Sequence, residues 1–396
     1  MTLSFIDTDV SFSGSLSSYN FTGARAVESG ANRYLFFIDG NDDIVYRKST
    51  NRGKTWGAAV VIHASTYEWI SVWFDQWTPG DSGTIVHIWG ITASVDDVNY
   101  LSLDISSDTI GNTGTPIVVF NGVSVLGGGN GGISGAKSKG GNLLVVFDID
   151  GGTEVGTYRS TDAGATWGVR ADANEAASTD YYLLFPGNEA DTQDMWLVFW
   201  DRSASAISLK TYDDSADSWA ETSVATSMTA VLTTTVNAQF SGTMRASDSH
   251  LLLAAWSARD SATGDLLTWD INGAGSITAK GNIHTDTDDC HGIVLTLNAA
   301  EAVFAAYIGK GDGSQTVSTA VTVNRKGSSD GMANWSAEQA VFDDFVSNIS
   351  VIFGALKAET SHPFVAWTWE NFSGTSDGLF GAYRPSSARS ISQIGV

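Results

Sequence analysis

Short apolar runs recur along the whole chain, and each is bounded by Gly, Asp, Asn or Ser. Apolar and polar positions alternate within and beside the runs as they do in strands, and the i, i+3, i+4, i+7 spacing of an amphipathic helix is almost absent. The runs occupy residues 34–38, 84–89, 143–147, 195–200, 251–256, 302–307 and 364–369. They recur about every 50 to 60 residues, a period typical of propeller blades of about four strands.

Each run has similar neighbours, which indicates a repeated unit. A shorter strand-like segment precedes it, another follows it, and a fourth follows a turn. The preceding segments at residues 21–25, 133–137 and 240–245 share a local pattern: FTGAR, ISGAK and FSGTMR. The pattern predicts an all-β fold, a seven-bladed β-propeller whose blades run from inner to outer strand. We expect residues 1–396 to form this propeller as a single domain.

The two ends of the chain compete to close the ring. Residues 3–12 alternate like a strand, and we expect them to form the outer strand of the last blade. Their apolar positions change face near Asp7, which predicts a bulge there. Residues 388–396 are the alternative closing strand. Joining both ends of the chain in one blade would remove an open sheet edge, which otherwise promotes aggregation.

One motif, at residues 158–168, reads YRSTDAGATWG and predicts a tight hairpin turn. The carboxylate of Asp162, which follows Ser160, can accept nearby backbone N–H groups. Gly164 can take a positive φ that a Cβ would resist. Trp167 then begins the next strand and buries a large ring. We expect a structural role for this turn, without chemistry.

A second copy begins at Ser49, where STNRGKTW keeps the same order of residue types. Asn51 stands in place of the Asp and can make the same turn. Gly53 and Trp56 complete the copy. Residues 213–219 and 328–335 are more divergent copies: the first has lost the glycine, and in the second the glycine has moved.

These turns resemble the Asp-box, or BNR repeat, of the sialidase-like propellers. The resemblance implies the propeller fold and, for a sialidase, three arginines, an acid/base Asp and a Tyr activated by a Glu. The first arginine of that family usually lies in an Arg-Ile-Pro motif, which this sequence lacks. Arg25 lies near the expected place, but Lys137 and Arg245 hold matching places in the repeat. We therefore attribute Arg25 to the blade pattern.

Composition narrows the classes of partner and compartment. The net charge of −23 opposes binding to nucleic acid or to an anionic membrane. Cys290 is the sole cysteine, so an internal disulfide cannot form. The N-terminal residues do not resemble a signal peptide, and no apolar stretch is long enough to span a membrane. We expect synthesis in the cytoplasm and a place in a virion or outside the cell.

Candidate chemistry is concentrated in Asp-rich loops on the face opposite the box-like turns. A glycoside hydrolase needs two carboxylates about 5–9 Å apart, and Asp39, Asp148, Asp201 and Glu370 all remain open as candidates. Rings placed to stack on a sugar, or alternatively to pack within loops, belong to Trp69, Trp369 and Phe372. The candidate ligand-binding set is therefore Trp69, Asp201, Trp369, Glu370 and Phe372.

The densest run of potential metal ligands is HTDTDDCH at residues 284–291. Asp286, Asp288 and Asp289 could bind a hard cation such as calcium through oxygen. The spacing matches no established metal motif, so a solvated acidic loop is the alternative, and we expect no obligatory cofactor.

Taken together, these features favour a non-catalytic binding or structural propeller. We expect a virion component, such as a phage tail or capsid surface protein, that contacts glycan or protein partners. The alternative is a glycoside hydrolase of sialidase-like fold acting on surface polysaccharide.

Overall fold

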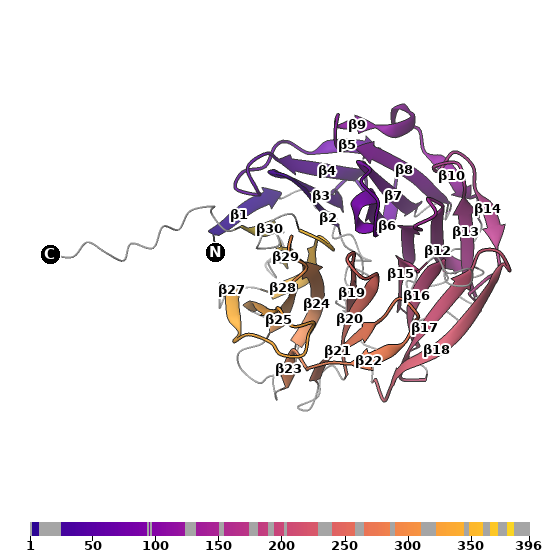
Figure 1. Cartoon of the computed structure of the whole chain (residues 1–396). Helices are drawn as coiled ribbons and strands as arrows, with labels where there is room; N and C mark the ends of the chain where they lie inside the picture. Colours follow the sequence, from indigo (N-terminus) through magenta and orange to yellow (C-terminus); the bar gives the residue numbers. More distant parts are fainter. Residues whose placement is uncertain are drawn as a thin grey trace.

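The fold is an all-β propeller, seen in a computed structural model in which successive sheets follow one another around a ring (Figure 1). The structure describes most of the chain, and the statements below refer to the described residues alone. They are residues 2–7, 25–92, 95, 97–122, 132–149, 154–173, 181–188, 194–201, 204–228, 240–257, 265–285, 290–309, 322–343, 348–358, 365–370 and 378–383. In these ranges, no helix reaches the length and apolar character needed to cross a bilayer.

Three blades form the first half of the ring. The first blade contains β2 (Ala26–Ser29), β3 (Asn32–Ile38), β4 (Ile44–Ser49) and β5 (Val60–His63). The second contains β6 (Tyr67–Phe74), β7 (Ile85–Thr92), β8 (Val98–Asp104), β9 (Thr109–Ile110) and β10 (Ile117–Phe120). The third contains β11 (Ile133–Lys137), β12 (Leu143–Ile149), β13 (Glu154–Ser160) and β14 (Gly168–Arg170).

Three more blades follow in chain order. The fourth contains β15 (Tyr181–Pro186), β16 (Met195–Asp201), β17 (Ala206–Asp213) and β18 (Ser218–Thr226). The fifth contains β19 (Phe240–Arg245), β20 (His250–Trp256), β21 (Asp265–Ile271), β22 (Ile277–Ala279) and β23 (His284–Thr285). The sixth contains β24 (Cys290–Leu297), β25 (Val303–Gly309), β26 (Thr322–Ser328) and β27 (Gln339–Asp343).

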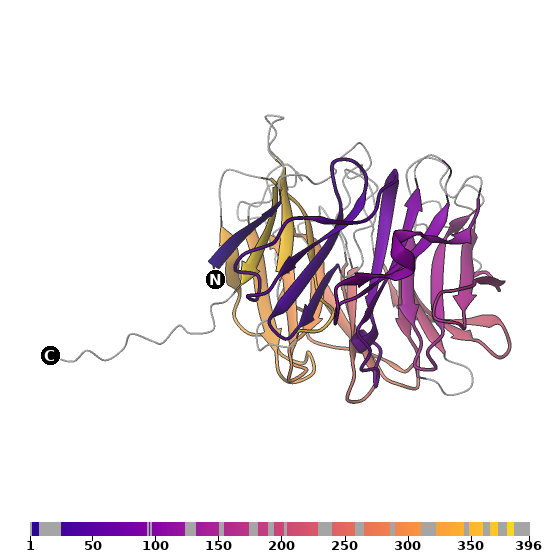
Figure 2. The same ribbon diagram turned by 90° about the horizontal axis from the view of Figure 1, so that it is seen from above.

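A composite sheet lies between the sixth blade and the first. It contains β28 (Asn348–Gly354), β29 (Val365–Glu370), β30 (Gly378–Tyr383) and β1 (Thr2–Asp7). β1 lies beside β30 and pairs with it from Thr2↔Tyr383 to Asp7↔Leu379 (Figure 2). The register shifts between Phe5 and Asp7, where the sequence predicts a bulge. The competing segment, residues 388–396, lies outside the described residues.

The predicted count of seven blades is wrong. Six blades are each built from one continuous stretch of chain, whereas the remaining sheet is assembled from both ends of the chain. The physical reason is closure, because pairing the first strand with the last covers an edge that an open chain would leave unpaired. The four-strand pattern also fails in two blades, where β9 and β23 pair as additional short strands.

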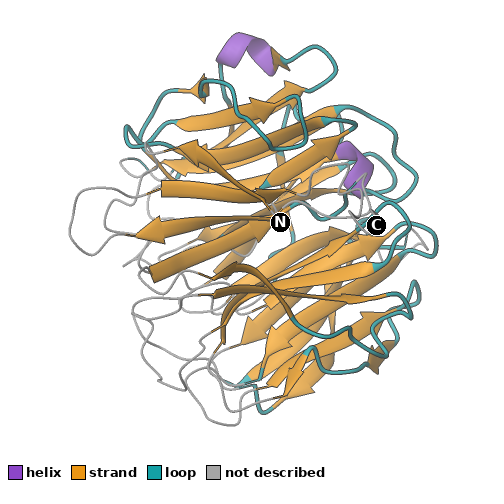
Figure 3. Cartoon of the chain, turned by 90° about the vertical axis from the view of Figure 1, so that its left-hand side faces the viewer, coloured by secondary structure: helices purple, strands orange, loops and turns teal. Residues whose placement is uncertain are grey.

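Burial falls from the middle strands to the outer strand, as the fourth blade shows, and this gradient explains why the predicted runs are apolar throughout. Every residue from Met195 to Trp200 in β16 is buried, whereas the outer strand β18 is largely exposed. A strand covered on both faces is apolar throughout, and an edge strand can be polar. Strands dominate the structure, and the short helical turns η1 (Asp75–Trp77) and η2 (Gly111–Gly114) lie outside the sheets (Figure 3).

The described core falls into two clusters. The larger includes the first four blades and part of the fifth. The smaller lies between the fifth and sixth blades and includes Trp256, Tyr307 and Met332, with Trp335 packed against it. The boundary between the fifth and sixth blades thus has a core of its own.

Candidate functional site: a cleft between the fifth and sixth blades

The turn of the third blade forms a closed set of local hydrogen bonds. The hydroxyl of Ser160 donates to Asp162 and accepts the N–H of Gly164 at 2.8 Å. The carboxylate of Asp162 accepts both the N–H and the hydroxyl of Thr166, at 2.8 and 2.6 Å. The hydrogen bonds from Thr166 and Ser160 lower the pKa of Asp162 to about 2. The turn in the first blade repeats this pattern with Asn51.

The sixth blade keeps the same hydrogen bonds with a different residue at the glycine position. Ser328 donates to Asp330 and accepts the N–H of Met332, and Asp330 accepts the N–H of Asn334. Met332 takes a φ of 69°, in the left-handed region that normally favours glycine. Its side chain is fully buried in the smaller core cluster. The sequence suggested that the glycine of this turn had moved to position 331. The structure shows that Met332 takes the place of the glycine.

The fourth blade has lost the pattern but kept the tryptophan. Asp213 accepts the backbone N–H groups of Ser215 and Ala216 instead. Trp219 donates its indole N–H across the blade boundary to the carbonyl of Ala171, at 2.9 Å. Polar residues of the turn also contact the third blade, because Asp217 accepts the N–H of Ala171 at 2.9 Å and Asp214 forms an ion pair with Arg170. Both the tryptophan and the polar turn therefore join these blades.

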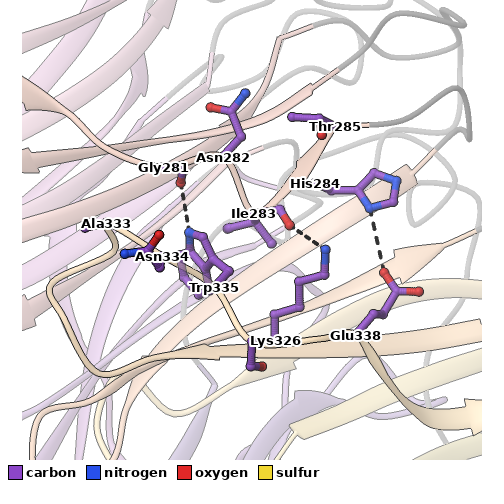
Figure 4. A pocket seen from close by; sticks show the side chains of 11 residues that line it. Gly281, Asn282, Ile283, His284, Thr285, Lys326, Ala333, Asn334, Trp335 and Glu338 are labelled. Atoms are coloured by element: carbon purple, nitrogen blue, oxygen red, sulfur yellow. Dashed lines mark hydrogen bonds and ion pairs between the residues drawn. The ribbon is translucent and has the colours of Figure 1, made fainter.

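A cleft of about 690 Å³ opens beside the turn of the sixth blade (Figure 4). Residues 281–285 of the fifth blade line one side of it. Lys326, residues 333–336 and Glu338 of the sixth blade line the other. The cleft therefore lies across the boundary between the two blades.

Hydrogen bonds between the two blades hold the base of the cleft. The indole N–H of Trp335 donates to the carbonyl of Gly281 at 2.8 Å, and the Gly281 N–H donates to the carbonyl of Met332 at 2.9 Å. The ammonium group of Lys326 donates to the carbonyl of Ile283 at 2.7 Å. A Cβ at position 281 would lie 2.4 Å from the carbonyl oxygen of Ala333, so this close approach requires glycine.

The polar end of the cleft brings together His284, Glu338 and Tyr307. Nδ1 of His284 lies 3.7 Å from Oε2 of Glu338, and the two side chains face each other in Figure 4. The hydroxyl of Tyr307 donates to the same carboxylate oxygen. The rings of Trp256 and Tyr307 flank the imidazole, with centroids 6.4 and 5.8 Å away. The Glu338 side chain is nevertheless 40% exposed, so its carboxylate is accessible from the cleft.

This arrangement suits a small polar molecule with an apolar face. Trp335 supplies a partly buried aromatic ring. Lys326 supplies a donor, Glu338 an acceptor, and the amides of Asn282 and Asn334 supply both. An aromatic surface beside a few convergent polar groups is the usual composition of a small-molecule site.

Of the predicted ligand residues, the structure describes the side chains of Trp69 and Asp201, and neither lines the cleft. Trp69 lies in β6 at 4% exposure inside the larger core cluster, so its ring has no open face for stacking on a sugar. Asp201 ends β16 and accepts the N–H of Ala204 at 2.8 Å. Trp369 and Glu370 end β29, and their side chains lie outside the described part of the structure, as does Phe372.

Two carboxylates proposed for hydrolysis have structural contacts. Asp39 accepts the N–H groups of Asn41 and Asp43 within its own loop, at 2.9 and 3.0 Å. Asp148 is 1% exposed and accepts the hydroxyl of Tyr182 at 2.7 Å. With these contacts, neither Asp39 nor Asp148 is placed as one of two carboxylates open to a substrate.

The predicted calcium ligands Asp286, Asp288 and Asp289 lie outside the described residues. Among the residues that are described, no three His, Cys, Asp or Glu side chains gather as a metal site would require. His284, from the same run, lies in the cleft.

The predicted equivalence of Arg25 with Lys137 and Arg245 is wrong. Lys137 and Arg245 pair with Leu143 and His250, the first residues of the following strands. The carbonyl of Arg25 instead accepts the N–H of Phe36, in the interior of β3. The side chain of Arg25 is 5% exposed and donates to the carbonyl of Ile70, and burial lowers its pKa to about 9.

A buried polar network at the boundary of the second and third blades was not predicted. Asp75 accepts Nε2–H of His87 at 3.0 Å and the ammonium group of Lys137 at 2.6 Å. Nδ1 of His87 lies 2.7 Å from the hydroxyl of Tyr100. Burial lowers the pKa of His87, whereas the hydrogen bonds from His87 and Lys137 outweigh burial and lower the pKa of Asp75 to about 2. Because His87 is only 3% exposed, we assign the network a structural role that links the second and third blades.

A second group, near the loops after β5, is also internal. The hydroxyl of Tyr67 lies 2.9 Å from Nδ1 of His63 and accepts the amide of Asn99 at 3.3 Å. Burial raises the pKa of Tyr67 to about 12, so the phenol stays protonated at neutral pH. Tyr67 is 1% exposed, which leaves the cleft at the sixth blade as the better candidate site.

Two segments singled out in the sequence reach the cleft, although neither was predicted to form a sugar site and the turns were expected on the face opposite the site. The divergent turn at residues 328–335 contains Trp335, and the ligand-rich run contains His284. Lys326 and Glu338 were missed. For Lys326, a signal was present in the sequence: nine residues separate it from Trp335, and the same spacing recurs from Lys210 to Trp219.

No protein-family model matches the sequence. No curated protein matches it either.

Several solved structures are similar to this chain. One is a polysaccharide lyase of family PL25, an ulvan lyase bound to -[GlcA(1-4)Rha3S]-, with 9% identity and a TM-score of 0.58; the match covers 95% of this chain and 94% of that chain. Another is a fucose-recognising lectin of Aleuria aurantia, with 12% identity, a TM-score of 0.47, and coverage of 81% and 97%. A Trypanosoma rangeli sialidase has 11% identity, a TM-score of 0.46, and coverage of 75% and 54%. At these identities the likeness shows the fold alone.

Proposed function

We propose that this chain is a glycan-binding propeller that holds a neutral sugar in the cleft between the fifth and sixth blades, without cleaving it. The observation that carries the proposal is the composition of the cleft: the Trp335 ring lies beside the Lys326 ammonium and the accessible Glu338 carboxylate. A sugar ring has an apolar face for the indole and hydroxyls for the charged groups.

The charge of the protein supports a neutral ligand. The ulvan lyase that shares the fold binds a glycan that contains glucuronate and a sulfated rhamnose. A net charge of −23 on this chain would repel such a polyanion. Within the cleft, one ammonium and one carboxylate offset each other, which suits hydroxyl groups better than acidic ones.

The setting we propose is a virion surface, such as a phage tail or capsid component, with residues 1–396 acting as one propeller. We assign the turns at residues 49–56, 160–167 and 328–335 as structural Asp-boxes. Their support is the shared set of hydrogen bonds from Ser49, Ser160 and Ser328. Immunodetection of the chain in purified particles from the source organism would test the setting.

Glycan-array binding followed by titration calorimetry tests the proposed function. We expect one or more neutral glycans to bind, and Glu338→Gln to weaken binding about tenfold, as loss of a charged hydrogen-bond acceptor would. Gln keeps an acceptor for Tyr307, so the variant should fold. Glu154→Gln, in β13 of the third blade, is the matched control and should bind normally.

Two outcomes would contradict the proposal: no binding to any neutral glycan, or unchanged affinity in Glu338→Gln. The same samples should be examined by chromatography for released sugars. Release would support the alternative, a glycoside hydrolase, and would require a search for its carboxylates.

A further inference from the structure

The boundary between the third and fourth blades repeats the contacts that hold the base of the cleft. There, Trp219 donates its indole N–H to the carbonyl of Ala171 at 2.9 Å, and Lys210 donates to the carbonyl of Ala173 at 2.6 Å. The corresponding bonds at the cleft run from Trp335 to Gly281 and from Lys326 to Ile283, at 2.8 and 2.7 Å. In both places the two carbonyls are two residues apart on the outer part of the preceding blade.

The sequence spacing is the same in both places. Nine residues separate Lys210 from Trp219, and nine separate Lys326 from Trp335. In the first and third blades, the residues nine positions before the turn tryptophan are Arg47 and Tyr158. Arg47 donates to the carbonyl of Gly57 in its own blade at 2.8 Å. We call the Trp–Lys pair and its two carbonyls the Trp–Lys frame, and it is formed at these two boundaries.

A glutamate accompanies the frame each time. Glu221 is directly opposite Lys210 in the strand pairing, with Oε2 3.6 Å from the ammonium nitrogen. At the cleft, Glu338 directly precedes Gln339, which pairs with Arg325, the neighbour of Lys326. Both carboxylates are accessible, since the Glu221 side chain is 50% exposed and that of Glu338 40% exposed.

The frame at the fourth blade has a ring as well as charges. Trp219 is only partly buried, and its centroid lies 4.9 Å from that of Tyr212. Lys210 is 5% exposed and is held between the Ala173 carbonyl and Glu221. Asp172 occupies the position that Asn282 has at the cleft. An indole, an ammonium and a glutamate are therefore present in both places, and a carboxylate at Asp172 replaces the amide of Asn282.

We infer that the boundary between the third and fourth blades is a second sugar subsite, for neutral or amino sugars, built on the same Trp–Lys frame. This inference rests on the proposed function of the cleft. Arg170 also lies at this boundary, where it pairs with Asp214 and Asp217. The carboxylates of Glu221 and Asp172 beside the Lys210 ammonium favour hydroxyl or amino donors and disfavour acidic sugars. Two subsites on one rigid ring would make the propeller bivalent, so a repeating glycan would bind more tightly than its single sugar.

Titration with simple glycosides tests the second subsite. The probes are methyl glucoside, methyl galactoside, methyl fucoside and glucosamine, followed by calorimetry and by ligand-observed NMR. For a probe that binds, we expect two sites per chain. Glu221→Gln and Glu338→Gln should each weaken one site about tenfold, and the double variant should weaken both. Glu154→Gln is again the control.

The outcomes separate this inference from the proposed function. One site per chain, lost in Glu338→Gln and unchanged in Glu221→Gln, would overturn the second subsite and leave the proposed function intact. A response to Glu221→Gln alone would locate the sugar at the third and fourth blades, contradict the cleft and overturn the inference of two subsites. Absence of binding by all four probes and by the glycan array would overturn both.

Discussion

The turn at residues 160–167 of the third blade and the turn at residues 328–335 of the sixth share one backbone design but have opposite environments. Both have a serine hydroxyl that accepts an N–H and an aspartate that accepts another. Both place the fifth residue in the left-handed region, with φ of 92° at Gly164 and 69° at Met332. One is glycine and the other is a fully buried methionine.

The difference comes from the neighbouring blade. A Cβ at Gly164 would lie 2.1 Å from Cε1 of Tyr100, whereas at the sixth blade the space is filled by the Met332 side chain. The tryptophans differ in the same way. Trp167 packs 5.4 Å from Tyr100 and 6.3 Å from Trp89, while Trp335 lines the cleft. Local hydrogen bonds set the backbone of the turn, and the contact across the boundary decides whether a side chain fits and whether a cleft remains.

The largest effect is expected from Gly164→Ala. Its Cβ would overlap the Tyr100 ring, and φ would remain positive for a non-glycine residue. Overpacking costs about 1–3 kcal/mol and the left-handed conformation about 1–2 kcal/mol, so we expect a loss of roughly 2–5 kcal/mol. Urea unfolding followed by tryptophan fluorescence measures it.

Gly168→Ala in the same blade is the matched control. A Cβ at position 168 has no heavy atom within 4 Å, and the residue is exposed. We expect a change within about 0.5 kcal/mol. Equal stabilities of the two variants would show that the Tyr100 side chain moves away at little cost. Contact with Tyr100 would then not explain why residue 164 is a glycine.

An effect of comparable size is expected at Met332. Met332→Ala removes a fully buried side chain and should cost roughly 2–5 kcal/mol. Met332→Gly loses one more carbon but relieves the positive φ, a gain of about 1 kcal/mol. We therefore expect the glycine variant to be no less stable than the alanine variant, as measured by denaturant unfolding.

Met244 in β19 provides the opposite case. It is 3% exposed and is not among the residues with positive φ. Met244→Gly should be less stable than Met244→Ala, because glycine in a strand loses more conformational entropy. The same order of stability at both positions would mean that the left-handed φ of Met332 stores no strain.

The two turns also show how far sequence reasoning reaches. The Ser, Asp and Trp pattern and the strand periodicity are local, so they predict the turns and the propeller. The pairing of Gly281 with Met332 joins positions 51 residues apart and depends on how two blades dock. Lys326 and Glu338 line a cleft only because the two blades dock in this way. Trp69 was mistaken for a loop ring because its strand, β6, begins at Tyr67 within the predicted loop.

The smallest effect is expected from the turn carboxylates at acid pH. Local hydrogen bonds, first of all from Thr166 and Asn334, lower the pKa values of Asp162 and Asp330 to about 2, from a model-compound value of 3.8. A carboxylate with a lowered pKa in the folded state stabilises the fold above pH 3.8. That contribution is lost as the pH falls from about 4 to about 2. Asn51, in the first blade, does not titrate.

We therefore expect the double variant Asp162→Asn, Asp330→Asn to lose less thermal stability than the unmodified chain between pH 4 and pH 2. Asn51→Asp should lose more over the same range, since it adds a third carboxylate in the same hydrogen-bonding position. Both carboxylates are exposed to solvent, so the differences in melting temperature should be small, but they should have opposite signs. Melting curves with the same pH dependence in all three proteins would show that these hydrogen bonds persist in the unfolded chain or contribute nothing to the folded one.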